Sequence, residues 1–420
     1  MYMQQKTDSV TDGFYNLGIA PAISVVLTKL RFYEPTPIQK QAIPIAIQGK
    51  DVVGIAQTGT GKTLAFGIPM IQRLLQTKKQ GLVLVPTREL ALQVEESLYK
   101  ICRIVGLRTV VLIGGTSLWP QIQALRNKPH IIIGTPGRII DHLEQKNMQL
   151  SGVDLVVLDE ADRMLDMGFM PQIQRIFKSL PRERQMMLFS ATMPPEIMKI
   201  AETYMQLPIR IEIAPAGTTA DKVTQEIFIV ARDQKENLLS KVLETHQTST
   251  LIFVRTKYGA KKMTLFIRSL GMCVAEIHSD RSLSQRREAL QGFKYGKYNI
   301  LVATDIASRG IDVVGIGLVL NYDLPATSDD YIHRIGRTAR AGAGGHAITF
   351  ATPQEGREIR AIERLIHQSL PIGKLDQYPS LSLTTFMQPE RRSPRSSRYP
   401  SSSRPSAWHN RNIHRSPRTR

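Results

Sequence analysis

The sequence predicts an α/β protein with two doubly wound parallel sheets in tandem. Short, continuous apolar runs recur along the chain, with helical stretches between them. Continuous rather than alternating apolar strands are typical of a sheet covered on both faces, and regular alternation with helices indicates parallel units. The expected strands are 52–55, 82–85, 109–113, 130–133, 154–158 and 186–189 in the first half, and 227–230, 251–254, 300–302, 317–320 and 347–350 in the second.

One intervening helix and one linker stand out. After Pro86, an apolar stripe at helical spacing comprises Leu90, Val94, Leu98 and Ile101. The segment 214–221 is small and polar and contains Pro and Gly, a composition typical of linkers. The expected organisation is a first domain at 1–213, a linker at 214–222, a second domain at 223–370 and a tail at 371–420.

Charge indicates a polyanionic partner. The chain has 420 residues and a formal net charge of +19, and the segment from Met387 onward has nine Arg, no Lys and one Glu. A basic body with a more basic tail favours nucleic acid first and a membrane surface second, although a merely soluble cationic protein shows the same balance. The Arg/Ser/Pro-rich tail is expected to be disordered, because it cannot bury enough apolar surface.

Cysteine usage and hydropathy suggest a cytoplasmic protein. Cys102 and Cys273 are far apart and lack metal-binding or disulfide spacing, so both are expected in the core. The polar residues 1–11 lack the apolar core of a signal peptide, and no apolar run is long enough to span a bilayer.

A glycine-rich segment is the first motif that carries chemistry. Ala56-Gln57-Thr58-Gly59-Thr60-Gly61-Lys62-Thr63 follows an expected strand and precedes a stretch that can form a helix. This is the order of a phosphate-binding loop, in which backbone N–H groups and the helix start face the phosphates. Lys62 would reach the β- and γ-phosphates, and the Thr63 hydroxyl would hold Mg²⁺. Because Ala56 stands where the general pattern has Gly, the alternative is a glycine turn before an ordinary helix.

An acidic cluster is the second motif. Asp159-Glu160-Ala161-Asp162 follows the expected strand 154–158, and open α/β sheets bind ligands at the carboxyl ends of their strands. Asp159 is placed to hold Mg²⁺ opposite Thr63, and Glu160 to orient or deprotonate a water. A solvated acidic turn is the alternative.

With these motifs in this order, the chain resembles the DEAD-box RNA helicases of helicase superfamily 2, over residues 14 to about 350. The resemblance implies RecA-like domains with ATP and Mg²⁺ as cofactors. The family's adenine-reading segment is similar to 32–39, where Gln39 would pair with adenine and Phe32 would stack on it. Arg31 replaces a usual glycine. Without the resemblance, Gln39 is interpreted as a surface residue after a turn. The implied ATP-binding set is Phe32, Gln39, Thr58, Gly59, Thr60, Gly61, Lys62, Thr63 and Asp312.

Several segments resemble the family's RNA-contacting motifs. They are 86–90, 114–115 and 135–138. Hydroxyls, glycines and helix starts present donors to phosphate oxygens, and arginines add charge. Alone, each segment is also an ordinary turn or helix cap. The implied RNA contacts are Thr87, Arg88, Gly115, Thr135, Arg138, Arg286 and Thr304.

The resemblance also implies coupling and catalytic residues. Asp162, Ser190 and Thr192 match the motifs that couple hydrolysis to RNA binding, and 253–256 and 303–312 match the fourth and fifth motifs. The sixth motif matches 333–340, with Ala339 where Gly is commoner. Its Arg337 and Arg340 would act as arginine fingers, which are worth about 10³–10⁵ in rate in GTPases. The implied catalytic set is Glu160, Lys62, Arg337, Arg340 and His333.

Two departures lie in 278–286. The family usually has Gly where this chain has Ser279, and Gln where it has Leu283. Because Leu283 removes a polar partner, a weaker RNA contact is expected at Arg286.

The resemblance implies an ATP-dependent RNA helicase that locally unwinds or remodels RNA duplexes and RNA–protein complexes by closure of its two domains. Structured or duplex RNA, bound largely without regard to sequence, is the expected partner of a monomeric core. One alternative is an ATP-gated RNA clamp. The other is a DNA-directed helicase, since only contacts to the 2′-hydroxyl distinguish RNA from DNA.

The stretches 162–169 and 209–219 look most like the RhlE-type bacterial subgroup, which suggests protein partners in ribosome assembly or RNA decay. The tail is expected to tether RNA nonspecifically, and a solvated or partner-docking tail is the alternative.

Overall fold

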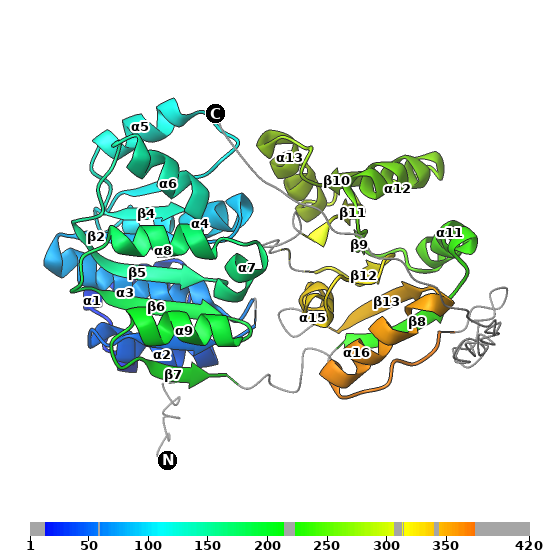
Figure 1. The fold of residues 1–420 in the computed structure, drawn as a ribbon, viewed down its shortest axis with the longest axis horizontal. Helices are drawn as coiled ribbons and strands as arrows, with labels where there is room; N and C mark the ends of the chain where they lie inside the picture. Colours follow the sequence, from blue (N-terminus) through cyan, green and yellow to red (C-terminus); the bar gives the residue numbers. More distant parts are fainter. Residues whose placement is uncertain are drawn as a thin grey trace, which may run out of the picture. The chain divides into compact units, whose positions relative to one another are not determined.

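The computed structural model of the protein describes residues 13–57, 59–213, 223–305, 313, 315–339 and 344–373. Their strands form two parallel sheets, one from residues before the expected linker and one from residues after it (Figure 1). The predicted fold class, two doubly wound α/β domains in tandem, is confirmed. The expected linker and the tail from residue 374 lie outside the described residues, so the domain boundaries stay predictions.

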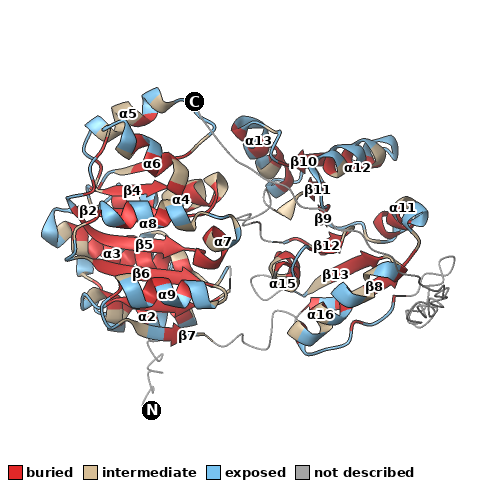
Figure 2. Ribbon diagram, in the orientation of Figure 1, coloured by how far each residue is buried: buried red, intermediate tan, exposed pale blue. Residues whose placement is uncertain are grey.

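The first sheet has seven strands in the order β3-β4-β2-β5-β6-β1-β7. Every residue of β1, β4, β5 and β6 is buried, as expected for strands covered on both faces (Figure 2). The bounds are β1 (Val52–Ile55), β2 (Gln80–Leu84), β3 (Thr109–Leu112), β4 (Ile131–Gly134), β5 (Val153–Asp159), β6 (Gln185–Ser190) and β7 (Ile209–Glu212).

Helices cover both faces of this sheet. Val157 of β5 points into a core shared with the first four helices, whereas its neighbours Val156 and Leu158 point into a second core. The helices are η1 (Phe14–Leu17), α1 (Pro21–Lys29), α2 (Pro37–Ile47), α3 (Lys62–Thr77), α4 (Arg88–Cys102), α5 (Leu118–Arg126), α6 (Pro136–Glu144), α7 (Ala161–Asp166), α8 (Met170–Lys178) and α9 (Pro195–Tyr204). The predicted apolar stripe of α4 is buried and confirmed.

The second sheet has six strands in the order β10-β11-β9-β12-β13-β8. Numbered within each domain, this is the strand order of the first sheet without β7. The strands are β8 (Val223–Ile229), β9 (Thr250–Phe253), β10 (Val274–Ile277), β11 (Ile300–Ala303), β12 (Leu318–Asn321) and β13 (Gly345–Ala351). The helices are η2 (Arg232–Gln234), α11 (Lys235–Thr245), α12 (Lys257–Ser269), α13 (Leu283–Lys294), α15 (Ser328–Ile335), η4 (Pro353–Glu355) and α16 (Gly356–Ile366).

Two strands were not predicted from the apolar runs, and both are edge strands. In β7, Arg210 and Glu212 alternate with apolar residues and are exposed. In β10, Glu276 interrupts the apolar run. An edge strand has one neighbouring strand instead of two, so it need not be a continuous hydrophobic run.

The expectation for the cysteines is half right. Cys102 is buried in α4, as predicted, but Cys273 is exposed. Cys273 lies in the turn between α12 and β10, outside the apolar core, and its backbone C=O accepts from the N–H groups of Asn299 and Ile300. The part of the chain that the structure describes has no helix both long and apolar enough to cross a membrane.

Candidate active site

The ends of three strands lie side by side in the first sheet. Ile55 of β1 is level with Ser190 of β6, and Phe189 of β6 is level with Asp159 of β5. Because the strands are parallel, the glycine-rich loop, the acidic cluster and the segment from Ser190 meet at one edge. This is the carboxyl edge, where open α/β sheets bind ligands.

The glycine-rich loop has the backbone that a phosphate loop requires. Gly59 and Gly61 have φ values of +83° and +89°, and the hydroxyl of Thr60 donates to the C=O of Gln57 at 2.7 Å. A Cβ on Gly61 would lie 2.4 Å from Nε2 of Gln39, so glycine is required there for space as well as for φ. Lys62 begins α3, is buried, and donates from Nζ to the C=O of Ala56 at 3.0 Å. Thr58 lies outside the described residues.

Gln39 joins the expected adenine-reading segment to this loop. Its Oε1 accepts from the Thr36 N–H at 3.0 Å, and its Nε2 donates to the C=O of Gly61 at 2.9 Å. Gln39 is buried, so the interpretation of a surface residue is wrong. Each amide atom keeps capacity for one further hydrogen bond. Phe32 is 41% exposed, which leaves its ring accessible for stacking.

The acidic cluster begins with two buried carboxylate residues, Asp159 and Glu160. Burial raises the pKa of Asp159 to about 6, against the lowering effect of Lys62. Its Oδ1 accepts from the Glu160 N–H at 3.0 Å. Glu160 is buried and has a φ of +52°, a left-handed conformation that is costly for a residue with a Cβ.

These residues fit Mg²⁺ bound together with a phosphate. Mg²⁺ prefers oxygen ligands and keeps several waters, and it is usually held by one or two carboxylates plus substrate phosphates. Asp159 offers a desolvated carboxylate and Thr63 a hydroxyl. Among the described residues, no three or more His, Cys, Asp or Glu side chains form a metal-binding group, so a full protein cage is not present there.

Asp162 forms hydrogen bonds with the end of β6 and with the two residues that follow it. Its Oδ2 accepts from the N–H of Thr192 at 2.9 Å, from the hydroxyl of Thr192 at 3.0 Å and from the N–H of Ala191 at 3.1 Å. Its own N–H donates to Oγ of Ser190 at 3.1 Å. Burial alone would raise the pKa of Asp162, but nearby positive groups and the Thr192 N–H outweigh it, so the pKa is lowered. The three predicted coupling residues are therefore in direct contact.

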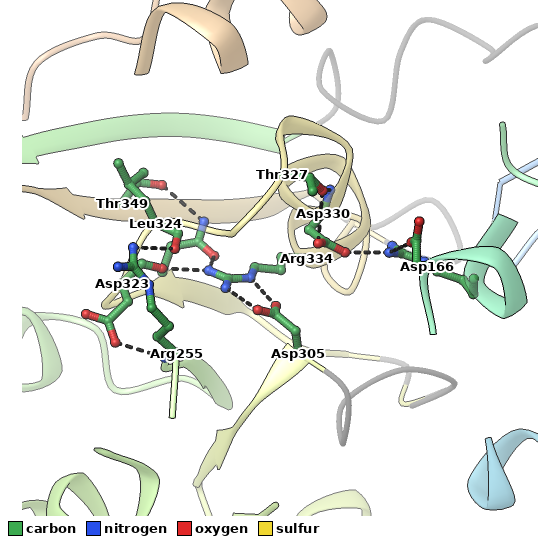
Figure 3. Close-up of polar contacts among 11 residues, drawn as sticks. Asp166, Arg255, Asp305, Asp323, Leu324, Thr327, Asp330, Arg334 and Thr349 are labelled. Atoms are coloured by element: carbon green, nitrogen blue, oxygen red, sulfur yellow. Dashed lines mark hydrogen bonds and ion pairs between the residues drawn. The ribbon is translucent and has the colours of Figure 1, made fainter. Parts of the chain in front are cut away.

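In the second domain, Arg334 forms a buried network (Figure 3). Its Nε and Nη2 donate to both oxygens of Asp305 at 2.6 and 2.7 Å, and its Nη1 donates to the C=O of Asp323 at 2.6 Å and to Oδ1 of Asn321 at 3.1 Å. Sequence reasoning gave Arg334 no role, although it lies in the sixth motif. Asp305, 29 residues earlier in the chain, is its partner, and no local pattern reveals such a pair.

The remaining sixth-motif residues are only partly described. Arg337 and His333 are described, whereas Arg340, and with it Asp312 of the fifth motif, lie outside the described residues. Burial, followed by the positive charge of Arg163, lowers the pKa of His333 to about 3, so this imidazole is neutral at pH 7.

Arg163 is a second residue that sequence reasoning did not single out. It is buried, forms an ion pair with Asp330, and lies 3.3 Å from Oδ2 of Asp166 (Figure 3). The i, i+3 spacing of Arg163 and Asp166 on α7 was the one available signal.

Three of the predicted RNA contacts lie together in the first domain. Arg138 donates from Nη1 and Nη2 to the C=O of Thr116, at 3.1 and 3.2 Å. A Cβ on Gly115 would lie 1.9 Å from Nη1 of Arg88. Burial, the neighbouring positive charge of Arg286 and, less strongly, that of Arg138 lower the pKa of Arg88. Such a concentration of guanidinium groups is suited to a polyanion.

The other predicted RNA contacts lie at helix starts or strand ends. Thr87 caps α4, because its hydroxyl oxygen accepts from the Leu90 N–H at 3.2 Å, and Thr135 occupies the position before α6. Thr304 follows β11. Arg286 lies 2.9 Å from Oε1 of Glu89 in an ion pair. Leu283, the departure in this segment, is buried at the start of α13.

At two of the four positions where this chain lacks the glycine of the pattern, the backbone adopts a conformation that glycine favours. Arg31 has a φ of +63° and Ala339 a φ of +54°. Both residues therefore adopt the left-handed backbone that glycine adopts most readily, so these substitutions keep the backbone course at a conformational cost.

Comparison with known families gives two matches. Residues 36–200 match the model of the DEAD/DEAH box helicase, and residues 234–342 match that of the helicase conserved C-terminal domain. The first match contains the glycine-rich loop, the acidic cluster and the coupling segment. The second contains Arg286, Thr304 and the sixth motif.

Individual relatives agree. The chain is 43% identical over 354 residues to the DEAD-box ATP-dependent RNA helicase CshA of Geobacillus kaustophilus, covering 84% of this chain and 76% of that protein. It is 40% identical over 390 residues to the ATP-dependent rRNA helicase RRP3 of Yarrowia lipolytica, covering 92% and 80%.

Solved structures are similar as well. Saccharomyces cerevisiae Dbp5 bound to RNA and ADP BeF3 matches with a TM-score of 0.77 and 29% identity, covering 86% of this chain and 95% of that one. Mss116p bound to single-stranded RNA and AMP-PNP matches with a TM-score of 0.78 and 27% identity, covering 86% and 78%. On these matches and the site geometry, the chain belongs to the DEAD-box family of ATP-dependent RNA helicases, enzymes that couple ATP to the unwinding and remodelling of RNA.

Proposed function

We propose that ATP and Mg²⁺ bind at the carboxyl edge of the first sheet. Lys62 and the loop N–H groups hold the phosphates, and Phe32 and Gln39 hold the adenine. Thr63 and Asp159 hold the metal, which supplies charge neutralisation and orientation of the phosphates when bound. Glu160 orients or deprotonates the attacking water. Arg337 and Arg340 act as arginine fingers from the second domain, with His333 beside them and Asp312 on the ribose.

The contact between Asp162 and Ser190-Ala191-Thr192 is the observation that carries the coupling. Asp162 joins the acidic cluster to the end of β6 by four hydrogen bonds, three accepted by its carboxylate and one donated by its N–H, so a shift of one segment must move the other. Binding of ATP and binding of RNA are therefore coupled, and the coupling is reciprocal. If bound RNA raises the affinity for ATP, bound ATP raises the affinity for RNA by the same factor.

The RNA is held by Thr87, Arg88, Gly115, Thr135 and Arg138 of the first domain, and by Arg286 and Thr304 of the second. These groups reach the sugar–phosphate backbone, so binding is largely independent of sequence. Structured or duplex RNA is the substrate that is remodelled, and one of its strands occupies this site. The core acts as a monomer in the cytoplasm. The RhlE-type likeness supports roles in ribosome assembly or RNA decay, with protein partners from those processes.

The decisive experiment measures steady-state ATP hydrolysis with Mg²⁺, without nucleic acid, with single-stranded RNA and with matched DNA. RNA-specific stimulation that is lost in Glu160→Gln is expected. Asp162→Asn should reduce RNA stimulation more than basal hydrolysis, whereas Asp166→Asn on the same helix, whose side chain is 48% exposed, should change neither.

Two results would redirect the proposal. Equal stimulation by DNA would support a DNA-directed helicase. RNA retention under a slowly hydrolysed ATP analogue, without duplex unwinding, would support an ATP-gated clamp.

A further inference from the structure

Trp119 is an exposed tryptophan on the surface of the first domain. It lies in the first turn of α5, and its side chain is 61% exposed. The helix packs against the edge strand β3 and buries only Gln121. The guanidinium of Arg126 lies over the indole, 5.8 Å from the ring centroid. The exposed indole presents an aromatic face on which a base can stack, and an arginine beside it adds a cation–π contribution.

The start of α5, which carries Trp119, is fixed next to the predicted RNA contacts. Gln121, two residues after Trp119, accepts from the Ile113 N–H at 3.2 Å and donates to the Thr116 hydroxyl at 2.8 Å. It also donates to the C=O of Ser117 at 3.1 Å, and Arg138 donates to the C=O of Thr116. One buried glutamine therefore fixes the start of α5 to the segment that contains Gly115, so Trp119 requires little ordering on binding.

The charge of this part of the chain favours a polyanion over a neutral or basic partner. From Ser97 to Ile140 the sequence contains no Asp or Glu. The basic residues in this stretch are Lys100, Arg103, Arg108, Arg126, Lys128 and Arg138. Proteins that bind single-stranded nucleic acid combine positive charge with aromatic side chains on which bases stack. Of these basic residues, Arg126 lies over the Trp119 ring and Arg138 contacts Thr116, three residues before Trp119.

We propose that Trp119 stacks on an unpaired base of the RNA strand bound at Gly115 and Arg138, on the ring face opposite Arg126. The inference rests on the RNA position given under Proposed function. It adds a contact to a base where the other predicted contacts reach the phosphates and sugars. Because every base has an aromatic face, the contact favours unpaired over paired nucleotides without selecting a sequence.

Fluorescence tests the stacking directly, because the chain contains two tryptophans, Trp119 and Trp408. In full-length Trp408→Phe, single-stranded oligouridylate added with a slowly hydrolysed ATP analogue should quench the emission of Trp119. The quench should saturate at the RNA concentration at which anisotropy of labelled RNA saturates. An abasic oligonucleotide of the same length should bind without the quench. RNA binding with unchanged emission would overturn the proposal.

Affinity provides the second test. Trp119→Ala should weaken single-stranded RNA binding by about 5- to 150-fold, the range measured for loss of one base–aromatic stack, and Trp119→Phe should restore most of it. Tyr15→Ala, which removes a 73% exposed aromatic outside this stretch, should leave the affinity unchanged. Unchanged affinity in a Trp119→Ala protein with normal thermal unfolding would overturn the proposal and favour a protein-docking role for Trp119.

Arg138→Ala separates this inference from the proposed RNA position. A loss of affinity in Arg138→Ala without one in Trp119→Ala refutes only the stacking. Unchanged affinity in both refutes the RNA position as well.

Discussion

Two buried lysines occupy the same topological place in the two sheets and have different surroundings. Lys62 begins α3, the first α-helix after the first strand of its sheet, and Lys235 begins α11, the first α-helix after β8. Lys62 donates to the C=O of Ala56 inside the glycine-rich loop. Lys235 donates to the C=O of Tyr322 at 2.9 Å and lies 5.5 Å from the Tyr322 ring centroid.

The difference shows that the shared strand order is a scaffold and that the connections give each domain its role. After β1 the chain makes a loop with two left-handed glycines, whereas after β8 it makes the short helix η2, which contains no glycine. β5 ends at Asp159 and is followed by Glu160, whereas β12 ends at Asn321 and is followed by Tyr322 and Asp323, whose backbone C=O accepts from Arg334. Function in such folds resides in the loops at the carboxyl edge.

The largest expected effect tests the two lysines against each other. Lys62→Ala should lower RNA-stimulated ATP hydrolysis per folded molecule at least about a hundredfold, because on the proposed binding mode it removes the charge that holds the phosphates. It should also lower the free energy of unfolding by about 1–3 kcal/mol, because the C=O of Ala56 loses its donor. Lys235→Ala should retain hydrolysis per folded molecule and lower the free energy of unfolding by about 1–3 kcal/mol, because the C=O of Tyr322 loses its donor. Equal loss of hydrolysis in both variants would break the comparison.

Arg334 extends the comparison of the two domains, because this arginine of the sixth motif stabilises the second domain through a buried hydrogen-bond network. Arg334→Ala should reduce the free energy of unfolding by about 3–5 kcal/mol, since it leaves the network around Asp305 and Asn321 uncompensated. Denaturant unfolding measures this. Arg175→Ala removes an ion pair with Glu144 whose two side chains are each 56% exposed, and should cost less than about 1 kcal/mol.

Asp154 tests the opposite, amino-terminal end of the first sheet. Arg73 contacts both of its oxygens, at 2.7 and 3.2 Å, and this pairing holds the pKa of Asp154 below its usual value of 3.8. The carboxylate therefore stabilises the fold above that value and loses this contribution as the pH falls through its lower, folded pKa. Asp154→Asn should cost about 1.5–3 kcal/mol at pH 7, with the difference shrinking below about pH 4 and hydrolysis at pH 7 unchanged. A pH-independent difference would contradict this account.

The smallest expected effect concerns RNA affinity. Gly115→Ala places a Cβ 1.9 Å from Nη1 of Arg88, which must move and should lower RNA affinity about tenfold. Gly106→Ala is the matched control, because Gly106 also has a left-handed φ, +80° against +72°, and no atom lies within 4 Å of its added Cβ. Both variants should lose about 1–2 kcal/mol of stability from backbone strain, and only the first should lose RNA binding. Equal RNA affinities would show that Arg88 does not need its present position.

Much of the fold was predictable because buried strands are continuous apolar runs. The strands β7 and β10 were not, since an edge strand tolerates Arg210, Glu212 or Glu276. The order of the motifs located the phosphate loop and acidic cluster, and parallel topology placed both at one edge. The pairing of Arg334 with Asp305 was not predictable, because one pattern contains several arginines and gives no sign of which one is buried. The position of Gln39, with both amide atoms bonded inside the protein, likewise depends on contacts between distant segments.

Glu160 has a consequence for engineering. A glycine would adopt its left-handed backbone at lower cost, so a search for stabilising substitutions would select this position, together with the exposed, left-handed Lys78, Lys128 and Lys146. Replacing Lys78 or Lys146, neither of which belongs to the basic stretch around Trp119, should relieve strain without loss of function. If Glu160 orients the water as proposed, replacing it would lower turnover while raising stability, so thermostability and catalysis would compete for this one residue.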